Sequence, residues 1–203
     1  REYLVRIQDA GELLLEIVND LLDLAKIEAG QMDLFVEPVD LAAIGRSVVN
    51  TTAGLLTDKP VELVTDFSPL LPAIYADGTR VRQILLNLMG NAAKYTDKGR
   101  ITLRMLTAEN DTVQISVIDT GIGIREEDFE RIFEEFQQTE DAFVLRKVGT
   151  GLGLPISQKF AQLHGGSLTV SSVYGQGSTF CLTLPISAPD LREKVVMQEV
   201  AVL

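Results

Sequence analysis

Residues 99–119 read GRITLRMLTAENDTVQISVID, and this stretch decides the fold class. Apolar and polar residues alternate on both sides of Asn110 and Asp111, and a period of two is typical of half-buried strands. Asparagine and aspartate favour tight turns because they tolerate the left-handed backbone conformation. The stretch therefore predicts two consecutive strands joined by a turn at these two residues.

The flanking sequence predicts helices interleaved with further strands. Helices are expected at residues 1–32, 40–56, 79–96, 125–136 and 153–166, a strand at 61–68, a short extended piece at 70–77 and a hairpin at 167–186. Asp40 is expected to be the N-cap of the second helix. Most strand pairs are joined by hairpins and not by helical crossovers, which argues against a doubly wound parallel sheet. We therefore expect an α+β fold, a two-layer sandwich with a mixed sheet under helices.

The first expected helix carries apolar residues at spacings of three and four, and it ends near Gly30, a residue type that commonly caps helix C-termini. Its apolar rows include Leu14 with Leu21 and Ile17 with Leu24, an arrangement that suits a helix of a bundle. The alternative is that this helix packs on its own globular domain.

Composition excludes several classes of function. The chain has 203 residues, of which 46% are hydrophobic and 23% charged, values typical of a globular protein. No apolar run approaches the roughly 18 residues that a membrane-spanning helix needs, and no leader pattern opens the chain, so a cytoplasmic location is expected. The parent protein could still be anchored in a membrane outside this region. A net charge of −11 would repel nucleic acid, which we exclude as a partner.

Cysteine chemistry is not expected. The chain has one cysteine, Cys181, which cannot form an internal disulfide. Its apolar neighbours, Phe180 and Leu182, predict that it is a small residue of the core.

Polar residues on the expected helix at 79–96 indicate a ligand site. Asn87 and Asn91 are four residues apart, so both amides project from one face of the helix. Amide oxygens can ligate a hard cation such as Mg²⁺ together with phosphate oxygens. Lys94 follows on the same side and could contact a phosphate, and Tyr95 could supply a ring to a base.

Two glycine-rich segments, DTGIGI at 119–124 and GTGLGLPIS at 149–157, favour close approach of a ligand to the backbone. Asp119 could accept a hydrogen bond from an exocyclic amine. The second segment precedes a helix, and backbone N–H groups at a helix N-terminus bind anions without basic side chains, as an acidic protein requires. It matches neither the P-loop nor the Rossmann pattern.

These motifs carry a resemblance to a known family. QILLNLMGNAAKYT, DTGIGI, IFEEFQQ and GTGLGLPIS, in this order, resemble the N, G1, F and G2 boxes of sensor histidine kinases, members of the gyrase, heat-shock chaperone, histidine kinase and MutL superfamily. LLEIVNDLLDLAKIEAGQM resembles the second helix of their dimerisation and phosphotransfer bundle. The resemblance implies part of that bundle helix at 1–33, a Bergerat-type ATP-binding domain at 34–188 and a tail or linker at 189–203.

The resemblance also implies an activity and its partners. Such a domain transfers the γ-phosphate of ATP, with Mg²⁺, to a histidine on a bundle helix of its own protein, for relay to the receiver domain of a response regulator. The bundle helices form a homodimer.

Site residues follow from the same resemblance. Asp119 would accept from the adenine amino group, with Gly121 and Gly123 passing close to the base and Tyr95 near it. Asn91 would ligate Mg²⁺, Asn87 would assist with metal or water, and Lys94 would contact phosphate; Asn87 and Lys94 would be the catalytic residues. A lid over the phosphates, anchored by Phe133 and Phe136, would contribute Arg146, Lys147, Gly149, Thr150, Gly151, Leu152, Gly153 and Leu154.

One departure from the family pattern concerns the phosphate acceptor. The acceptor histidine of the family lies on a helix ahead of the one found here, and the only histidine of this chain is His164, at an expected helix end. A capping or packing role is expected for it. We therefore expect this region to bind Mg-ATP without phosphorylating itself.

Three alternatives stay open. An ATPase of the same superfamily would carry a glutamate base where Asn87 stands, and an amide cannot take a proton from water at neutral pH. A serine kinase related to the anti-sigma factors shares the nucleotide boxes but needs no bundle helix. A nucleotide-binding scaffold without activity is the third.

Overall fold

The computed structural model describes residues 2–137 and 149–187. Its elements are α1 (Glu2–Glu28), β1 (Glu37–Val39), α2 (Leu41–Leu55), β2 (Val61–Phe67), β3 (Ile74–Ala76), α3 (Gly78–Tyr95), β4 (Gly99–Ala108), β5 (Thr112–Asp119), the 3₁₀ turns η1 (Glu126–Asp128) and η2 (Arg131–Phe133), α5 (Gly153–Leu163), β6 (Ser167–Val173) and β7 (Gly177–Pro185).

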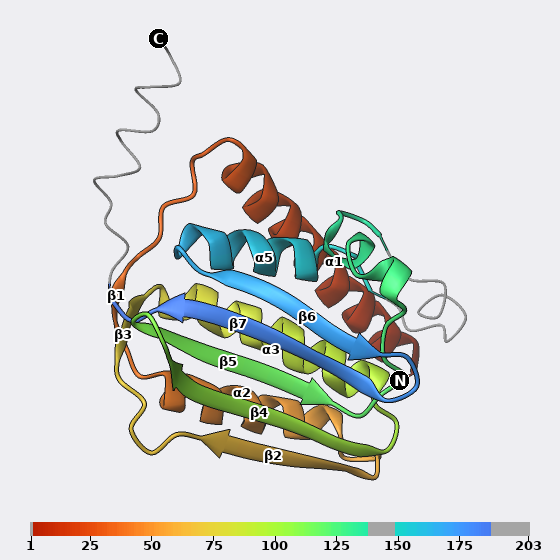
Figure 1. Ribbon diagram of the computed structural model, residues 1–203. Coiled ribbons are helices and arrows are strands. Elements are labelled where there is room, and N and C mark those ends of the chain that lie inside the picture. The colour runs from red at the N-terminus through yellow and green to blue at the C-terminus, as the bar shows by residue number, and fades with distance from the viewer. Residues whose placement is uncertain (1, 138–148, 188–203) are drawn as a thin grey trace.

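The main sheet has the strand order β2-β4-β5-β7-β6 (Figure 1). β2 and β4 are parallel and the other neighbours are antiparallel, so the expected mixed sheet is confirmed. β4 and β5 form the expected hairpin, with positive φ angles of 57° at Asn110 and 55° at Asp111. β5 is the central strand and pairs with a neighbour on each side. Its last residue, Asp119, therefore lies at the C-terminal end of a fully paired strand.

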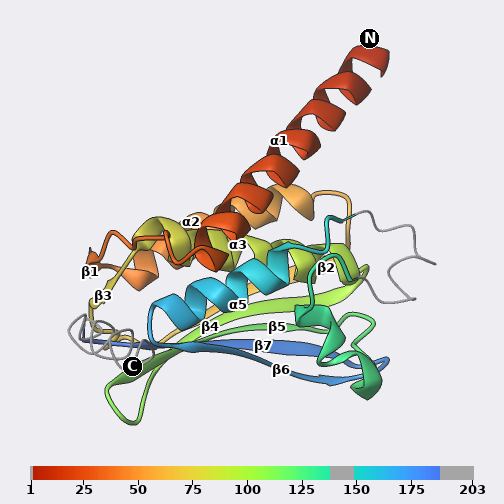
Figure 2. The same ribbon diagram turned by 90° about the horizontal axis from the view of Figure 1, so that it is seen from above.

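Three helices cover one face of this sheet. In Figure 2, α2, α3 and α5 lie against the sheet, and α1 crosses them on the side away from the strands. The inward residues of β5 and β7 alternate with partly exposed ones along each strand. Phe160 of α5 and Met89 of α3 are fully buried between the layers. The opposite face of the sheet, toward the viewer in Figure 1, carries no helix among the described residues.

Both long helices of the domain begin at a capping aspartate. Asp40 accepts a hydrogen bond from the Ala43 N–H at 3.0 Å, which confirms it as the N-cap of α2. Asp77 caps α3 through Oδ1, which accepts from the N–H groups of Thr79 at 3.0 Å and Arg80 at 3.1 Å. Each cap satisfies backbone donors that a helix N-terminus leaves without partners.

The other end of α3 is held by a lysine from the chain before β2. Lys59 Nζ donates to the carbonyl oxygens of Ala93 at 2.6 Å and Thr96 at 3.1 Å. A cation at a helix C-terminus offsets the negative end of the helix dipole and occupies carbonyls that have no helical partner. The position of α3 is therefore defined at both ends.

Gly30 ends α1 as expected. It has a φ of +65°, and the N–H of Gln31 donates to the Lys26 carbonyl while the N–H of Gly30 donates to the Ile27 carbonyl. These two bonds form a Schellman motif, which requires the left-handed conformation that glycine adopts readily. No helix among the described residues is both long and apolar enough to cross a membrane.

The apolar rows of α1 divide between the domain and solvent. Leu24 is buried and Ile17 is half-buried, so the row that they share faces the domain. Ile27 is also half-buried and packs against the core. Five large apolar side chains of this helix are exposed, namely Leu14, Leu15, Val18, Leu21 and Leu22. One row therefore packs on the domain, and the interpretation of α1 as a helix of a bundle stays a prediction.

Polar contacts fix α1 onto α3. Arg80 Nη1 donates to Asp23 Oδ2 at 2.7 Å, and Gln83 Nε2 donates to the same oxygen at 3.3 Å. The guanidinium of Arg80 also lies 4.7 Å from the centroid of the Phe160 ring. Because Asp23 and Arg80 are mostly buried, this pair is shielded from solvent better than a surface salt bridge.

A second ion-pair group joins α1 to α5. Lys159 Nζ donates to Glu28 at 3.3 Å and to Glu135 at 2.9 Å. Burial lowers the pKa of the Lys159 ammonium, but the two carboxylates outweigh burial and raise the pKa above its usual value. The lysine thus stays charged and joins three parts of the chain.

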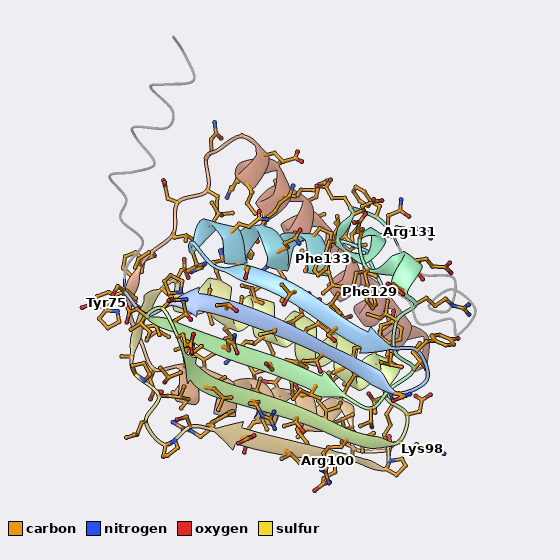
Figure 3. All side chains as sticks on the ribbon, in the orientation of Figure 1. Tyr75, Lys98, Arg100, Phe129, Arg131 and Phe133 are labelled. Atoms are coloured by element: carbon orange, nitrogen blue, oxygen red, sulfur yellow. The ribbon has the colours of Figure 1, made fainter. Side chains whose placement is uncertain are left out.

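Three expectations from the sequence were wrong in detail. The segment 125–136, expected to be a helix, forms the two separate turns η1 and η2, because Ile132 and Phe133 turn inward to pack on the core while Phe136 takes a positive φ of 61°. Figure 3 labels Phe129, Arg131 and Phe133 on these turns. β1 was not expected, since three residues including a proline carry no strand signal. Cys181 is half-exposed on the helix-free face, because its alternating position points away from the core.

His164 has the expected packing role at the end of α5. It is 1% exposed, its Nε2 accepts from the Asp77 N–H at 3.0 Å, and its Nδ1 lies 2.7 Å from the Phe160 carbonyl oxygen. The ring therefore carries its proton on Nδ1 and is neutral. It joins the end of α5 to the residue that caps α3.

We predict that His164→Phe lowers the free energy of unfolding by about 1–3 kcal/mol, because it leaves the buried Asp77 N–H without an acceptor. Urea unfolding followed by circular dichroism measures the change. Gln162→Ala, on an exposed position of the same helix, is the control and should change the free energy little. Equal effects of both substitutions would contradict the role of the imidazole.

Candidate functional site

A cavity of about 350 Å³ opens between α3, the start of α5 and the two glycine segments. Most of the residues predicted for the site line this one cavity, namely Asn87, Asn91, Lys94, Tyr95, Asp119, Gly123, Gly149, Thr150, Gly151, Gly153 and Leu154. These residues come from three separate stretches of sequence, and the fold brings them together.

Asp119 forms one end of the cavity. It is buried, and its Oδ1 accepts from the Gly121 N–H at 2.8 Å. Burial raises the pKa of the Asp119 carboxyl, and hydrogen bonds from the backbone of Gly121 and Ser178 offset part of that rise. The carboxylate is thus oriented by the backbone and presented to the cavity as an acceptor.

Two glycines beside Asp119 allow the chain to pass through a narrow space. A Cβ atom on Gly121 would lie 2.5 Å from the Tyr95 carbonyl oxygen, and one on Gly123 would lie 2.3 Å from the Val173 carbonyl oxygen. Gly123 also has a φ of +69°, which side chains with a Cβ rarely adopt. Gly121 does not line the cavity, so its contribution to the site is indirect, through Asp119.

The asparagines of α3 form the middle of the cavity. Asn87 Nδ2 donates to Ser157 Oγ at 3.0 Å, and Asn91 Nδ2 donates to Asn87 Oδ1 at 3.4 Å. These bonds orient the amides, so that Asn87 Oδ1 faces the start of α5. A Cβ on Gly153 would lie only 2.3 Å from that oxygen. The helix can therefore begin beside Asn87 only because residue 153 has no side chain.

Lys94 and Tyr95 lie at the C-terminal end of α3. Lys94 Nζ is 5.0 Å from the centroid of the Tyr95 ring, and a Cβ on Gly149 would lie 2.8 Å from Nζ. Burial raises the pKa of the Tyr95 hydroxyl, so that it stays protonated at neutral pH. The ammonium group of Lys94 thus lies close to the backbone of the second glycine segment at Gly149.

The second glycine segment approaches the end of η2. The Phe136 N–H donates to the Gly151 carbonyl at 3.1 Å, and Thr150 Oγ1 accepts from the Leu152 N–H at 3.1 Å. Leu152 was predicted to contribute to the site. Its side chain is instead 1% exposed and belongs to the core, and it does not line the cavity. The predicted Arg146 and Lys147 lie outside the described residues.

Charge is unevenly distributed around the cavity. Among the described residues that line it, the carboxylates are Asp119 and Asp20, and the cation is Lys94. The start of α5 adds backbone N–H groups with a partial positive charge. Anionic ligand groups are therefore favoured between Lys94 and the start of α5.

A comparison with protein-family models matches residues 76–188, more than half of the chain, to the family described as histidine kinase-, DNA gyrase B- and HSP90-like ATPases. The chain belongs to this family. The matched region begins at the strand before α3 and ends after β7, so it contains both glycine segments and the asparagines of α3.

Relatives within the ATPase family are histidine kinases. The circadian input-output histidine kinase CikA of Synechococcus elongatus is 40% identical over 91% of this chain, and the aerobic respiration control sensor protein ArcB of Escherichia coli is 37% identical over 96% of it. The chain spans about a quarter of the length of either relative. Full-length ShkA, solved in complex with AMPPNP, is 35% identical, with a TM-score of 0.82 over 93% of this chain and 39% of its own.

Several lining residues were missed by the sequence analysis. They are Asp20, Leu86, Gly90, Ala92, Ile122, Ile124, Ile132, Gln137, Pro155, Ser178 and Phe180. Ser178 pairs with Asp119 across β5 and β7, and the sequence does not show that register. Asp20 carried no signal, because it lies on α1, far from every glycine segment.

We predict that Gly153→Ala destabilises the protein by about 1–3 kcal/mol, because the added methyl group overlaps Asn87 Oδ1. Gly54→Ala is the matched control, since it lies in α2 with open space around it and should stabilise by up to about 1 kcal/mol. Chemical unfolding of the unaltered protein, Gly153→Ala and Gly54→Ala measures the two changes in the free energy of unfolding. If both alanines stabilise, the contact between Gly153 and Asn87 does not limit the packing.

Proposed function

We propose that this chain is the ATP-binding catalytic core of a sensor histidine kinase and transfers the γ-phosphate of ATP to a histidine on a bundle helix of the same, longer protein. The observation that carries the proposal is one cavity with a buried acceptor, Asp119, at one end and two amides, a lysine and a helix N-terminus toward the other. Two further facts support it, the kinase relatives and the nucleotide analogue AMPPNP in the ShkA structure.

Asp119 would recognise adenine. Its carboxylate accepts hydrogen bonds only, so it suits the exocyclic amino group of adenine and would repel the carbonyl oxygen that guanine carries at the same position. Ile122, Ile124 and Phe180 provide apolar walls for a flat base, and the ring of Tyr95 lies on the same side.

The amide oxygens of Asn87 and Asn91 fit a magnesium ion bound with the nucleotide. Oxygen ligands together with phosphate oxygens are the set that Mg²⁺ prefers, and both asparagines line the cavity, with Asn87 Oδ1 turned toward Asn91 and the start of α5. When bound, the ion would neutralise phosphate charge. We propose Asn91 as a ligand and Asn87 as a ligand of the ion or of its water.

Phosphoryl transfer needs position and charge stabilisation more than a base. An imidazole nitrogen of the acceptor would attack the γ-phosphorus, the bond to the bridging oxygen would break, and ADP would leave. Lys94 and the N–H groups at the start of α5 would stabilise the negative charge on the phosphoryl oxygens. Asn87 cannot activate water as a base, so transfer is favoured over hydrolysis.

Partners and location follow from this proposal. The exposed apolar side chains of α1 would pack in a bundle with the acceptor helix and with a second subunit, and the phosphohistidine would be the donor for the receiver domain of a response regulator. The domain would work in the cytoplasm, where ATP is available. The proposed division is 1–33 for the bundle helix, 34–188 for the ATP-binding domain and 189–203 for a tail or linker.

Incubation with γ-³²P-labelled ATP and Mg²⁺ tests the proposed activity. The longer protein should incorporate label that resists alkali and is lost in acid, and this chain by itself should not, since His164 is buried with both ring nitrogens in contact with the backbone. Asn91→Ala should abolish labelling of the longer protein, whereas Asn50→Ala, an exposed position of α2, should not. Absence of acid-labile phosphate in the longer protein would contradict the kinase.

We predict that Asp119→Asn weakens ATP binding by about 1.5–3 kcal/mol, the range for a hydrogen bond to a charged group. The folded state should keep its stability, because the side chain retains its size. Calorimetric titration with an ATP analogue and thermal unfolding measure the two effects. Unchanged affinity with a lower melting temperature would mean that Asp119 is structural.

The same residue predicts a pH dependence. Burial raises the pKa of the Asp119 carboxyl. As the solution is acidified, Asp119 therefore becomes protonated at a higher pH than an ordinary aspartate does. Affinity for adenosine, which carries no phosphate that titrates, should fall through that raised pKa and be restored above it. Titrations followed by NMR at several pH values check this, and Asp119→Asn should show a flatter profile.

We predict that Leu14→Glu lowers self-association of the chain. Leu14 is 61% exposed on α1 in a group of apolar side chains, and each such side chain that becomes buried contributes roughly 1.5–3 kcal/mol. Light scattering over a range of concentrations measures the effect. Leu70→Glu, at an even more exposed leucine outside any helix, is the control, and an equal loss in both variants would contradict pairing through α1.

A further inference from the structure

One side chain of α1 enters the wall of the cavity, and it is the carboxylate of Asp20. We propose that Asp20 binds the magnesium ion of the bound nucleotide, either directly or through one of its waters, when α1 is docked on the domain. The inference rests on the proposed function and extends it, because it adds a residue from the bundle helix to the nucleotide site.

The contacts of α1 with α3 define the level of Asp20 along the cavity. Asp23 bonds to Arg80 and Gln83 of α3. Asp20 is three residues before Asp23, so it projects from the same face one turn earlier. Asn87 is four residues after Gln83, one turn further along α3. Asp20 therefore lies at the level of Asn87.

The contacts of α1 with α5 give the same position. Glu28 bonds to Lys159, and α1 and α5 run in the same direction, each starting on the side of the cavity (Figure 1). From Glu28 back to Asp20 is a rise of about 12 Å, and from Lys159 back to Gly153 about 9 Å, at 1.5 Å per residue. Asp20 thus lies beside the start of α5, where Gly153 meets Asn87 Oδ1. This is the phosphate end of the proposed nucleotide site.

A carboxylate at this end has a specific electrostatic consequence. It repels the phosphates of a nucleotide without metal, and it attracts a divalent cation that bridges to those phosphates. Magnesium sites usually include one or two carboxylates besides the phosphates, and Asn87 and Asn91 are neutral. Within the described wall of the cavity the other carboxylate is Asp119, which is held at the opposite end by the Gly121 N–H. Asp20 is therefore the carboxylate that we place at the phosphate end of the cavity.

The placement on α1 links metal binding to the position of the helix. A metal–nucleotide complex that contacts Asp20 binds more tightly to the docked arrangement than to one with α1 displaced. By thermodynamic reciprocity, the complex then favours docking by the same factor. A nucleotide without metal, whose phosphates Asp20 repels, binds more tightly when α1 is displaced from the domain.

Calorimetric titration of ADP, with Mg²⁺ and with EDTA, tests the inference in the whole chain and in Asp20→Asn. We expect the variant to lose on the order of tenfold in affinity for Mg-ADP, the lower range for residues that support a bound metal. Affinity for metal-free ADP should stay the same or rise. Asp33→Asn, which removes the same charge at an exposed position outside the cavity, is the control and should change neither affinity.

Asp20→Asn could also lower the affinity by displacing α1 from the domain. Amide hydrogen exchange of residues 20–28 in the nucleotide-free proteins tests this, and we expect equal protection in Asp20→Asn and in the unaltered chain. Equal loss of affinity with and without Mg²⁺ would overturn the inference, as would tighter binding in both conditions, which would make Asp20 only a repulsive neighbour. If the unaltered chain bound ADP in neither condition, the proposed function itself would fail. If it bound Mg-ADP and the variant did so equally well, only the role of Asp20 would fail.

Discussion

The rest of the structure depends on the hydrogen bonds around Asp77. Its carboxylate accepts from the first N–H groups of α3 and from the Phe35 N–H, and its own N–H donates to the buried His164 at the end of α5. One residue thus joins the segment after α1, the start of α3 and the end of α5. Since buried polar groups are costly without partners, loss of one of these bonds leaves another group unpaired. They hold the start of α3 against the end of α5.

The contact between α1 and the domain has a different character from the core. Leu24 and the partly buried Ile17 and Ile27 pack on the domain, while the five exposed apolar side chains of the described part of the helix point away. Ion pairs of Arg80 with Asp23 and of Lys159 with Glu28 supplement this packing. The contact therefore combines little apolar area with ion pairs, of which Arg80–Asp23 is largely shielded from solvent.

Much of the fold could be predicted from the sequence. The hairpin at Asn110 and Asp111, the cap at Asp40 and the glycine end of α1 depend on neighbouring residues, and each was predicted correctly. The sequence predicted residues that share the cavity where a motif lies within one helix or loop, as for Asn87 with Asn91. Leu152 follows the glycine pattern, but its side chain belongs to the core and does not line the cavity, because its burial depends on tertiary packing.

The sequence by itself determined the family, most of the order of helices and strands, and many of the residues that share the cavity, because periodicity, caps and glycine spacing are local properties of the chain. Only the tertiary structure decided that Asp20 of α1 and Ser178 of β7 share a cavity with Asp119. Only the tertiary structure decided that His164 supports α3, and that Cys181 faces away from the core. The physical reason is that contacts between residues far apart in the chain depend on strand register and helix packing, which many residues set together.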